Sequence, residues 1–468
     1  QRQMCIRDSP LYGSDYTNRV VMSLMYQGLF AVDSKNNTTP ILCSQYQVTP
    51  DNRTWTIYLE PNATFSDGTR VTVQDVVASY EQARQNVYYK GRFTHIARVE
   101  LSSDGGVDFF LDTPYQNLAL LLDIPIVKAS EVTVDNPLGT GPYSLEDGIG
   151  GKHLQRVVGW WCSSDDLVAK DSSIALVEAE SPSQIRDEFE FSGLSVVCTN
   201  PQTDSYADYR CDFELWEVDS GFMMYIGCNV TYSKFFDDGT LRTFLTYGID
   251  RQTLVDDNYG GLALPTTLPI SPMSPYYSKS LATNYDYDEM RFIDAASKFR
   301  VPTNDKGVPR TLQLLVNSDD SARLRCARNI AATLTELGLA CETVESPTSV
   351  YEARLQAANY DIYLGITKLP TTADLSEFYR PWGEMSWGGL ANETIYNMVN
   401  QSLADRGNYY NLHKLVADDG RIIPVMAGYY AIYAKRGVLS DLNPARDNVF
   451  YYTLGKTMES SKVATQFS

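Results

Sequence analysis

The order of apolar and polar residues along the chain follows two periods, and each period predicts a different kind of element. Between residues 54 and 59 apolar and polar side chains alternate, which is typical of a half-buried strand. After Thr72, apolar side chains recur every three or four residues up to Tyr80, so we expect an amphipathic helix with Thr72 as its N-cap. Residues 20–30 show a similar spacing, which predicts a short helix that ends near Gly28.

The pattern between residues 312 and 366 changes repeatedly from a buried strand to an amphipathic helix. Strands separated by helices of this length run parallel, and the helices cover the faces of their sheet. The sequence therefore predicts an α/β lobe in this part of the chain. We expect strands at 312–316, 340–344 and 360–366, and helices at 321–337 and 349–358.

Residues 235–265 predict two short helices in succession. The polar run 237–240 offers acceptors for the first backbone N–H groups of one helix, and Asp250 offers them to the next. Gly260-Gly261 should end the second helix, because glycine readily takes the left-handed conformation found at helix C-termini.

The length of the chain, 468 residues, exceeds what one hydrophobic core usually organises, so we expect at least two lobes. A hydrophobic content of 43% is enough for packed cores. The apolar segments 225–229 and 421–426 are the expected crossings between lobes. A cleft between two lobes is the usual place for a ligand and for hinge closure.

The formal net charge of -19 is spread along the chain, which favours solubility and disfavours contact with phosphate backbones. Nucleic acid is therefore not an expected partner. Because no apolar run reaches the roughly 20 residues of a membrane-spanning helix, we expect a soluble chain.

The residues that usually carry metal or catalytic chemistry are widely scattered. Eight cysteines and three histidines lack the close spacing of a zinc or iron–sulfur site, so we expect no metal and no cofactor. The cysteines are expected to be buried thiols, and a Cys198–Cys211 disulfide stays open. The sequence holds neither G-x-S-x-G nor H-E-x-x-H, and paired carboxylates such as Asp237-Asp238 are expected to be caps, so we expect no catalytic residues.

The first nine residues, QRQMCIRDS, differ in character from the rest of the chain. They have no apolar core and no lipobox, so we interpret 1–9 as a non-native scar and expect a true signal peptide upstream. On this interpretation Cys5 is not a lipidated cysteine.

Four motifs occur in a family-like order from Pro10 onward. Residues 51–77 read D-x-x-T-W-T-I-x-L, five further residues, and F-S-D-G-T-x-V-T-x-x-D-V-V. G-T-G-P-Y follows at 139–143, I-D-R at 249–251 and I-P-V at 423–425. Together they resemble the family 5 solute-binding proteins of ABC transporters, the extracytoplasmic peptide-binding type that includes oligopeptide, dipeptide and nickel binders.

The resemblance implies an α/β, two-lobe periplasmic-binding-protein-like fold of type II, with an extra subdomain in lobe I. Its mixed sheets are flanked by helices, and two crossover strands form the hinge. The implied lobe I main part is 10–25, 117–225 and 426–468, its extra subdomain is 26–116, and lobe II is 226–425.

The resemblance also implies where a ligand is bound. Peptide binders of the family usually present G-W-x-x-D, whose carboxylate pairs with the amino terminus of the ligand, but here Gly365 begins G-I-T-K-L. Because Lys368 has the opposite charge, we expect a ligand that carries an acid or a carboxylate. Trp382 and Trp387 are the aromatics most expected to contact it. The expected ligand-binding residues are Tyr26, Gln27, Tyr225, Asn229, Thr367, Lys368, Asp374, Trp382, Trp387 and Tyr429.

The implied function is that of a receptor for an ABC importer. Such a protein is not an enzyme: it binds an oligopeptide or a similar-sized solute in the cleft between its lobes and delivers it to a membrane permease. We expect a monomer outside the cytoplasm, either periplasmic or held to the membrane as a lipoprotein. Two alternatives stay open, a secreted hydrolase on a two-lobe scaffold and a sensory or chaperone-like binding protein.

Overall fold

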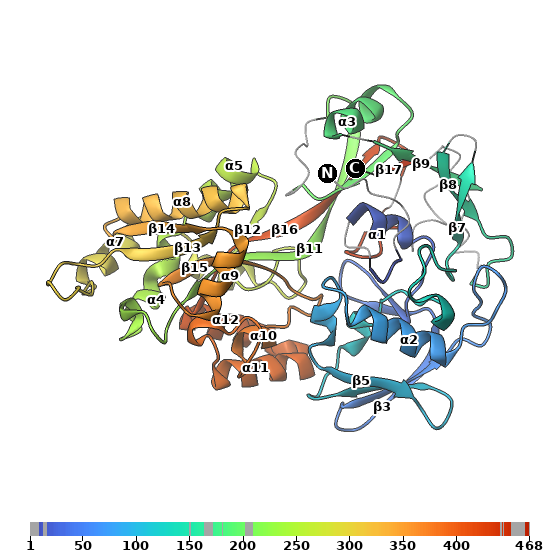
Figure 1. Cartoon of the computed structure of the whole chain (residues 1–468), viewed down its shortest axis with the longest axis horizontal. Helices are drawn as coiled ribbons and strands as arrows, with labels where there is room; N and C mark the ends of the chain where they lie inside the picture. Colours follow the sequence, from blue (N-terminus) through green and yellow to red (C-terminus); the bar gives the residue numbers. More distant parts are fainter. Residues whose placement is uncertain are drawn as a thin grey trace. The chain divides into compact units, whose positions relative to one another are not determined.

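The computed structural model divides the chain into two compact units. Unit 1 comprises Gln1–Val218 and Tyr430–Ser468, and unit 2 comprises Asp219–Tyr429. The chain passes between them twice, along strands β11 (Phe213–Cys228) and β16 (Ile422–Lys435) (Figure 1). Among the described residues no helix has both the length and the apolar character needed to cross a membrane. The structure describes residues 9–12, 16–148, 151–162, 172–179, 181–201, 209–439, 442, 444–450 and 464–467.

The described residues of unit 1 contribute strands to two sheets besides the short pair β1–β2. One has the antiparallel order β3-β4-β6-β5, and the other has the order β16-β10-β17-β9-β8-β7. The elements of unit 1 are α1 (Tyr16–Met22), β1 (Phe30–Val32), β2 (Thr38–Pro40), β3 (Cys43–Val48), β4 (Thr54–Leu59), α2 (Val73–Ala83), β5 (Ile96–Leu101), β6 (Val107–Leu111), β7 (Tyr143–Gly148), β8 (Gly151–Arg156), β9 (Ser173–Glu178), α3 (Pro182–Phe191), β10 (Val196–Thr199) and β17 (Ala464–Phe467).

The predicted strand and helix near the start of the chain are confirmed. Trp55 and Ile57 point from β4 into the core, 4% and 0% exposed, while Thr54, Thr56 and Tyr58 stay half-buried. Helix α2 begins at a capping box, in which the Thr72 hydroxyl accepts from the Asp75 N–H and the Asp75 carboxylate accepts from the Thr72 N–H. Helix α2 packs against β5 and β6, so the four-stranded sheet has one covered face (Figure 1).

The helix predicted at 20–30 is wrong in its position. Helix α1 covers Tyr16–Met22, and the chain then continues in an irregular path to β1. The backbone groups that a longer helix would use are bound elsewhere: the Met25 carbonyl accepts from Gly141 N–H at 2.8 Å, and the Gln27 carbonyl accepts from Ile126 N–H at 2.9 Å. The last helix-like bond runs from the Tyr26 N–H to the Met22 carbonyl at 2.9 Å, and the carbonyls of Met25 and Gln27 then bind distant segments instead.

The glycines of the G-T-G-P-Y loop permit a close backbone approach. A Cβ on Gly139 would lie 2.0 Å from the carbonyl oxygen of Met25, and one on Gly141 would lie 2.6 Å from that of Leu24. The indole N–H groups of Trp160 and Trp161 in turn donate to the carbonyl of Thr140, at 2.7 and 3.0 Å. The loop thus packs closely against the segment that carries Tyr26 and Gln27 and holds it in place.

Unit 2 is built on a sheet of order β14-β13-β15-β11, where β13 runs parallel to both β14 and β15 and β11 is antiparallel to β15. The predicted α/β lobe is therefore confirmed. The elements of unit 2, besides its parts of β11 and β16, are α4 (Thr240–Phe244), α5 (Arg251–Tyr259), β12 (Leu264–Pro265), α6 (Lys279–Ala282), α7 (Glu289–Lys298), β13 (Leu312–Asn317), α8 (Ser321–Glu336), β14 (Cys341–Ser346), α9 (Thr348–Gln356), β15 (Ile362–Lys368), α10 (Ser376–Tyr379), α11 (Glu393–Ala404) and α12 (Tyr409–Asp419).

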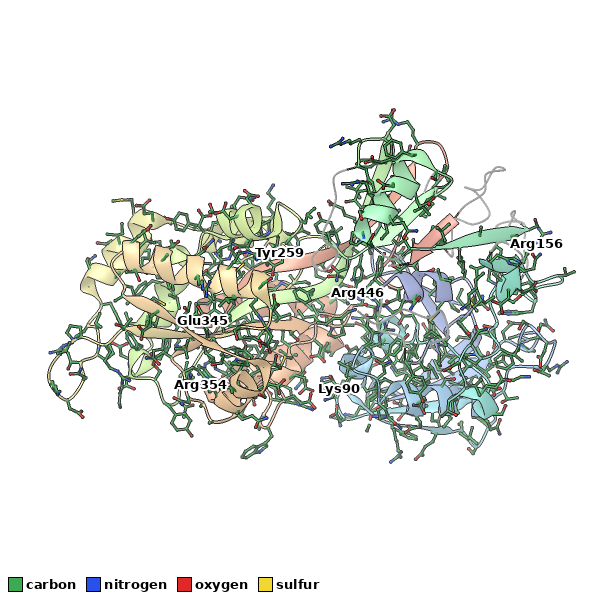
Figure 2. The ribbon with its side chains drawn as sticks, turned by 45° about the horizontal axis from the view of Figure 1, so that its top comes forward. Lys90, Arg156, Tyr259, Glu345, Arg354 and Arg446 are labelled. Carbon is green, nitrogen blue, oxygen red and sulfur yellow. The ribbon has the colours of Figure 1, made fainter. Side chains whose placement is uncertain are left out.

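Helix α8 supplies much of the core of unit 2. Cys326, Ile330 and Leu334 recur at spacings of four residues and are 0–2% exposed. They pack in one cluster with Leu314 of β13 and Ile362 of β15. Figure 1 shows α8 lying along β13 and β14, and Glu345 of β14 is labelled in Figure 2.

The two short helices predicted within 235–265 are present as α4 and α5. Asp250 caps α5 by accepting from the N–H of Thr253 at 3.1 Å. The helix ends at Tyr259, labelled in Figure 2, and Gly260 follows in the left-handed conformation with φ 58°. The local capping signal thus located α5 correctly, whereas α4 begins after Gly239, which has no side-chain acceptor, and Asp238 accepts from the Thr240 N–H at 2.9 Å.

The described cysteines are thiols, and Cys5 lies outside the described residues. Cys198 and Cys211 are both thiols, so the disulfide that the sequence left open is absent. Burial raises the pKa of the Cys198 and Cys326 thiols to about 12. Thiols with such a high pKa are poor nucleophiles, which fits a packing role.

His413 on α12 predicts how the stability of unit 2 depends on pH. The ring is 0% exposed, neither ring nitrogen has a hydrogen-bond partner, and burial lowers its pKa from 6.5 to about 3. Below pH 6.5 the unfolded chain takes up a proton that the folded chain excludes, so stability is complete above pH 6.5 and falls towards pH 3. The expected loss is about 1.4 kcal/mol per pH unit.

Replacing His413 by leucine should remove this loss. Between pH 6.5 and 5, the free energy of unfolding of the wild type should fall by about 2 kcal/mol more than that of His413→Leu, as measured by urea titration. The same titration at pH 7.5 gives the baseline for any change in packing. Parallel pH profiles of the two proteins would contradict this role of His413.

Candidate functional site

The strongest candidate site is a pocket in unit 2 at the carboxyl ends of parallel strands. It measures about 790 Å³ with its open mouth, and it is reached by Asn317 at the end of β13 and by Gly365 and Ile366 near the end of β15. Ligands of open α/β sheets bind beyond this edge, because helix N-termini and loops rather than packed side chains surround it. The other lining residues are Tyr225, Arg323, Tyr351, Glu352, Leu355, Gln356 and Trp387.

Arg323 gives this pocket a positive charge. It lies in the first turn of α8, where the N-cap residue Asp320 accepts from its backbone N–H at 3.0 Å and sits 3.5 Å from its Nε. Its guanidinium lies 5.5 Å from the ring centroid of Tyr351, and its side chain is only 12% exposed. The guanidinium is thus held in place by a single long ion pair and one aromatic face, which leaves it able to bind a further anion.

Aromatic rings form one wall of the pocket. The rings of Tyr225 and Tyr363 lie 5.7 Å apart and edge to face, and Trp387 lies 6.0 Å from Tyr363. The Tyr363 hydroxyl donates to that of Tyr225 at 3.3 Å. Gly365 makes room for this wall, since a Cβ there would lie 2.6 Å from the Tyr225 ring. Burial raises the pKa of Tyr225, so its hydroxyl stays protonated at neutral pH.

Of the residues predicted in unit 2, the structure brings Tyr225 and Trp387 together in this pocket. Thr367 and Lys368 follow directly on β15, where they pair with Met223 and Phe222 of β11 and are half-buried. Their predicted role stays a prediction.

The other predicted residues of unit 2 are engaged differently. Asn229 is 1% exposed and donates to the carbonyls of Ala358 and Tyr360, each at 2.8 Å. Asp374 is buried and accepts from the N–H of Ser376 at 2.8 Å.

Trp382 and Tyr429 are opposites in exposure. Trp382 is 97% exposed and adopts φ 63°, a backbone conformation that is uncommon for a bulky residue, whereas Tyr429 is 4% exposed on β16. Neither residue lines a pocket described for unit 2. Both stay predictions as ligand contacts.

The two predicted residues of unit 1 line a separate pocket of about 590 Å³. The Tyr26 hydroxyl donates to the carbonyl of Pro137 at 2.7 Å, and the Gln27 side-chain oxygen accepts from Trp161 at 3.2 Å. The pocket is also lined by four charged side chains. They are Arg19, Arg92, Asp123 and Asp447.

A third pocket, of about 670 Å³ in unit 2, surrounds the arginine of the I-D-R motif. Arg251 is 4% exposed, and burial lowers its pKa to about 10. Its Nε donates to the Pro424 carbonyl at 2.8 Å and its Nη2 to the Thr246 hydroxyl at 2.8 Å. Arg251 therefore ties α5 to β16, and its role is in packing.

Within the described residues, no group of three histidine, cysteine or acidic side chains is placed to hold a metal ion. His95 is bound to Asp112 at 2.8 Å, and His153 lies 4.0 Å from Glu146. The unit 2 pocket is therefore suited to binding. Its arginine can pair with an anion, and its aromatic rings can contact apolar or planar groups.

Sequence reasoning missed Arg323, and a usable signal was present. The segment N-S-D-D-S-A-R begins where β13 ends, so its N-cap aspartate places the arginine in the first turn of the next helix. In an α/β lobe that position faces the carboxyl edge of the sheet.

Comparison with protein families finds a matching model. The model of bacterial extracellular solute-binding proteins, family 5 Middle, matches residues 37–389. Among curated proteins, the glutathione-binding protein GsiB of Escherichia coli O6:K15:H31 is 25% identical over 299 residues. That match covers 59% of this chain and 56% of GsiB, so the chain spans a little over half the length of the curated relatives it matches.

Solved structures resemble the whole chain. A peptide-binding protein AppA from Clostridium difficile, described as putative, has a TM-score of 0.74 at 15% identity, covering 94% of this chain and 96% of its own. The oligopeptide-binding protein AppA from Bacillus subtilis, in complex with a nonapeptide, has a TM-score of 0.66 at 16% identity, covering 97% and 96%. These likenesses confirm the predicted fold class, the two-lobe α/β fold of periplasmic binding proteins.

Proposed function

We propose that this chain, which belongs to the family 5 bacterial extracellular solute-binding proteins, is the receptor of an ABC importer for a peptide or peptide-sized solute with a free carboxylate. It binds the solute without altering it and delivers it to a membrane permease. It acts outside the cytoplasm as a monomer, periplasmic or anchored as a lipoprotein. The placement of the solute between the lobes stays a prediction from the sequence.

One observation carries the choice of ligand, namely the position of Arg323 at the rim of an aromatic pocket. A guanidinium that is 12% exposed and held by one ion pair of 3.5 Å gains most from a planar carboxylate, which accepts two parallel hydrogen bonds. Tyr225 and Trp387 offer rigid rings to the rest of the ligand at little cost in side-chain entropy. One relative is named for binding glutathione, and another was solved in complex with a nonapeptide. Both support a ligand of this class.

The test is to identify what the protein carries. The full chain is purified without denaturant and then unfolded, and the released small molecules are analysed by mass spectrometry. We expect an intact solute with a carboxylate in nearly stoichiometric amount. After refolding, peptides of three to five residues should bind with a Kd of about 10 μM or tighter in calorimetry.

Two outcomes would contradict the proposal. Turnover of a peptide or glycan library, with no solute retained, would favour the secreted hydrolase. Retention of a solute that lacks any acidic group would remove the assignment of Arg323 and leave the receptor function standing.

A further inference from the structure

Two buried arginines of unit 1 bind one carboxylate. Arg19 on α1 is 6% exposed, and Arg92, in the 3-10 turn Lys90–Phe93, is 7% exposed. Arg19 Nε lies 3.4 Å from one oxygen of Asp447, and Arg92 Nη2 donates to the other at 2.7 Å. The Tyr88 hydroxyl donates to the same carboxylate. One ion pair from α1, one hydrogen bond from the 3-10 turn and one from Tyr88, just before that turn, therefore converge on Asp447.

The arginines are held in place by other contacts as well. The Arg19 guanidinium stacks 3.9 Å above the ring of Tyr88, and its Nη2 donates to the Tyr430 hydroxyl at 3.0 Å. Arg92 forms a second ion pair with Asp123. Because these contacts do not involve Asp447, the two guanidinium groups would keep their positions if its carboxylate left.

Charge counting shows what the site would become without Asp447. Among the described charged residues that line the pocket, Arg19 and Arg92 are then opposed by Asp123, so this group carries one net positive charge in a buried place. Arg446, labelled in Figure 2, adds a further positive charge that acts on Asp123. Burial of an uncompensated charge is costly, so the emptied site would strongly favour an anion.

Asp447 reaches the site from the tip of a tight turn. Ala445 and Asn448 close the turn with two backbone hydrogen bonds of 3.1 and 3.2 Å, and Arg446 and Asp447 lie between them. Asp447 and both arginines line the 590 Å³ pocket, a volume that includes its open mouth, so the ion pairs border a space that opens to solvent. Among the described residues the turn pairs only within itself, through the bridge of Ala445 with Asn448, so its withdrawal would leave the described strand pairs of unit 1 intact.

We infer that Arg19 and Arg92 form a carboxylate-binding site in unit 1, occupied internally by Asp447, which the carboxylate of a small solute can replace. Two guanidinium groups and a tyrosine hydroxyl supply the donors that a monocarboxylate such as formate or acetate requires. The inference concerns unit 1 alone and stands whether or not the proposed function holds.

The test uses Asp447→Ala in the full chain. Without added carboxylate its thermal unfolding midpoint should lie below that of the wild type, because the two arginines lose a shared partner. Sodium formate should raise this midpoint in a saturable manner at constant ionic strength adjusted with sodium chloride. Calorimetry should give a formate affinity about tenfold or more higher than that of the wild type, where Asp447 competes.

Asp419 supplies a matched control. Its carboxylate is 13% exposed, as that of Asp447 is, and it pairs with Arg242 at 2.7 Å and Arg421 at 3.1 Å. It lines none of the three pockets described above. Asp419→Ala should therefore lose stability without a response specific to formate.

Equal responses of the two variants to formate, or no response of Asp447→Ala, would overturn the inference. If Asp447→Ala does not fold in chloride, its refolding is followed with and without formate. Recovery of the fold by formate supports the site, and failure to recover overturns it. Asp447→Asn, which keeps the shape of the side chain, should behave as Asp447→Ala does.

Discussion

Arg323→Ala is expected to weaken the binding of a peptide with a free carboxylate by about thirtyfold or more, since loss of one partner of a buried charge pair costs about 2 kcal/mol or more. The pocket that it leaves would still offer the rings of Tyr225 and Trp387 but no positive charge from α8. Arg323→Lys keeps the charge and loses the planar guanidinium group, so its affinity for the peptide should lie between those of the wild type and Arg323→Ala. Isothermal titration calorimetry with the peptide identified from the purified protein gives these affinities.

The pairing of Arg323 with a carboxylate can be isolated by changing the ligand as well. Amidation of the peptide C-terminus should cost the wild type as much affinity as Arg323→Ala does, and it should cost the variant little. Arg325 provides the matched control: it lies on the same helix, is exposed, and donates to the Asn258 carbonyl at 3.2 Å. Additive losses in this cycle, or an equal effect of Arg325→Ala, would contradict the assignment.

Gly139→Ala is expected to destabilise unit 1 by about 3 kcal/mol or more, at the upper end of overpacking substitutions. The added methyl group would lie 2.0 Å from the carbonyl oxygen of Met25 and 3.0 Å from the Tyr26 ring, so backbone rather than a side-chain end must move. The same movement would displace Tyr26 from its hydrogen bond with Pro137. Urea denaturation monitored by circular dichroism measures the change in the free energy of unfolding.

Gly193 is the control for the loss of glycine itself. It also lies in unit 1, and its φ is not positive. A methyl group added to its Cα would have no heavy atom within 4 Å. Gly193→Ala should be neutral or slightly stabilising, because it restricts the unfolded chain. A similar loss of stability in both variants would show that close packing of Gly139 on Met25 is not the cause.

The sequence predicted those elements whose signals are local. Thr72 with Asp75, and Asp250 with Thr253, form caps within one turn, so the starts of α2 and α5 could be read directly. The parallel arrangement of β13, β14 and β15 followed from strands alternating with long helices. The motif order identified the family.

What the sequence could not predict depends on contacts between distant segments. The chain after Met22 has helical spacing of apolar residues, yet its carbonyls bind the segments around Ile126 and Gly141. The N-cap aspartate Asp320 indicates that Arg323 lies in the first turn of a helix, but only the fold shows that it lies 5.5 Å from Tyr351 in a pocket. Arg19 and Asp447 are separated by most of the chain, so no local pattern links them.

The strand order of unit 1 governs when this unit can form during synthesis. Strand β17 lies between β9 and β10 and pairs in parallel with both, and β10 also pairs with β16. Both partners, β16 and β17, leave the ribosome only after unit 2 has been made. The growing chain therefore carries open strand edges at β9 and β10 throughout its translation, and such edges invite aggregation.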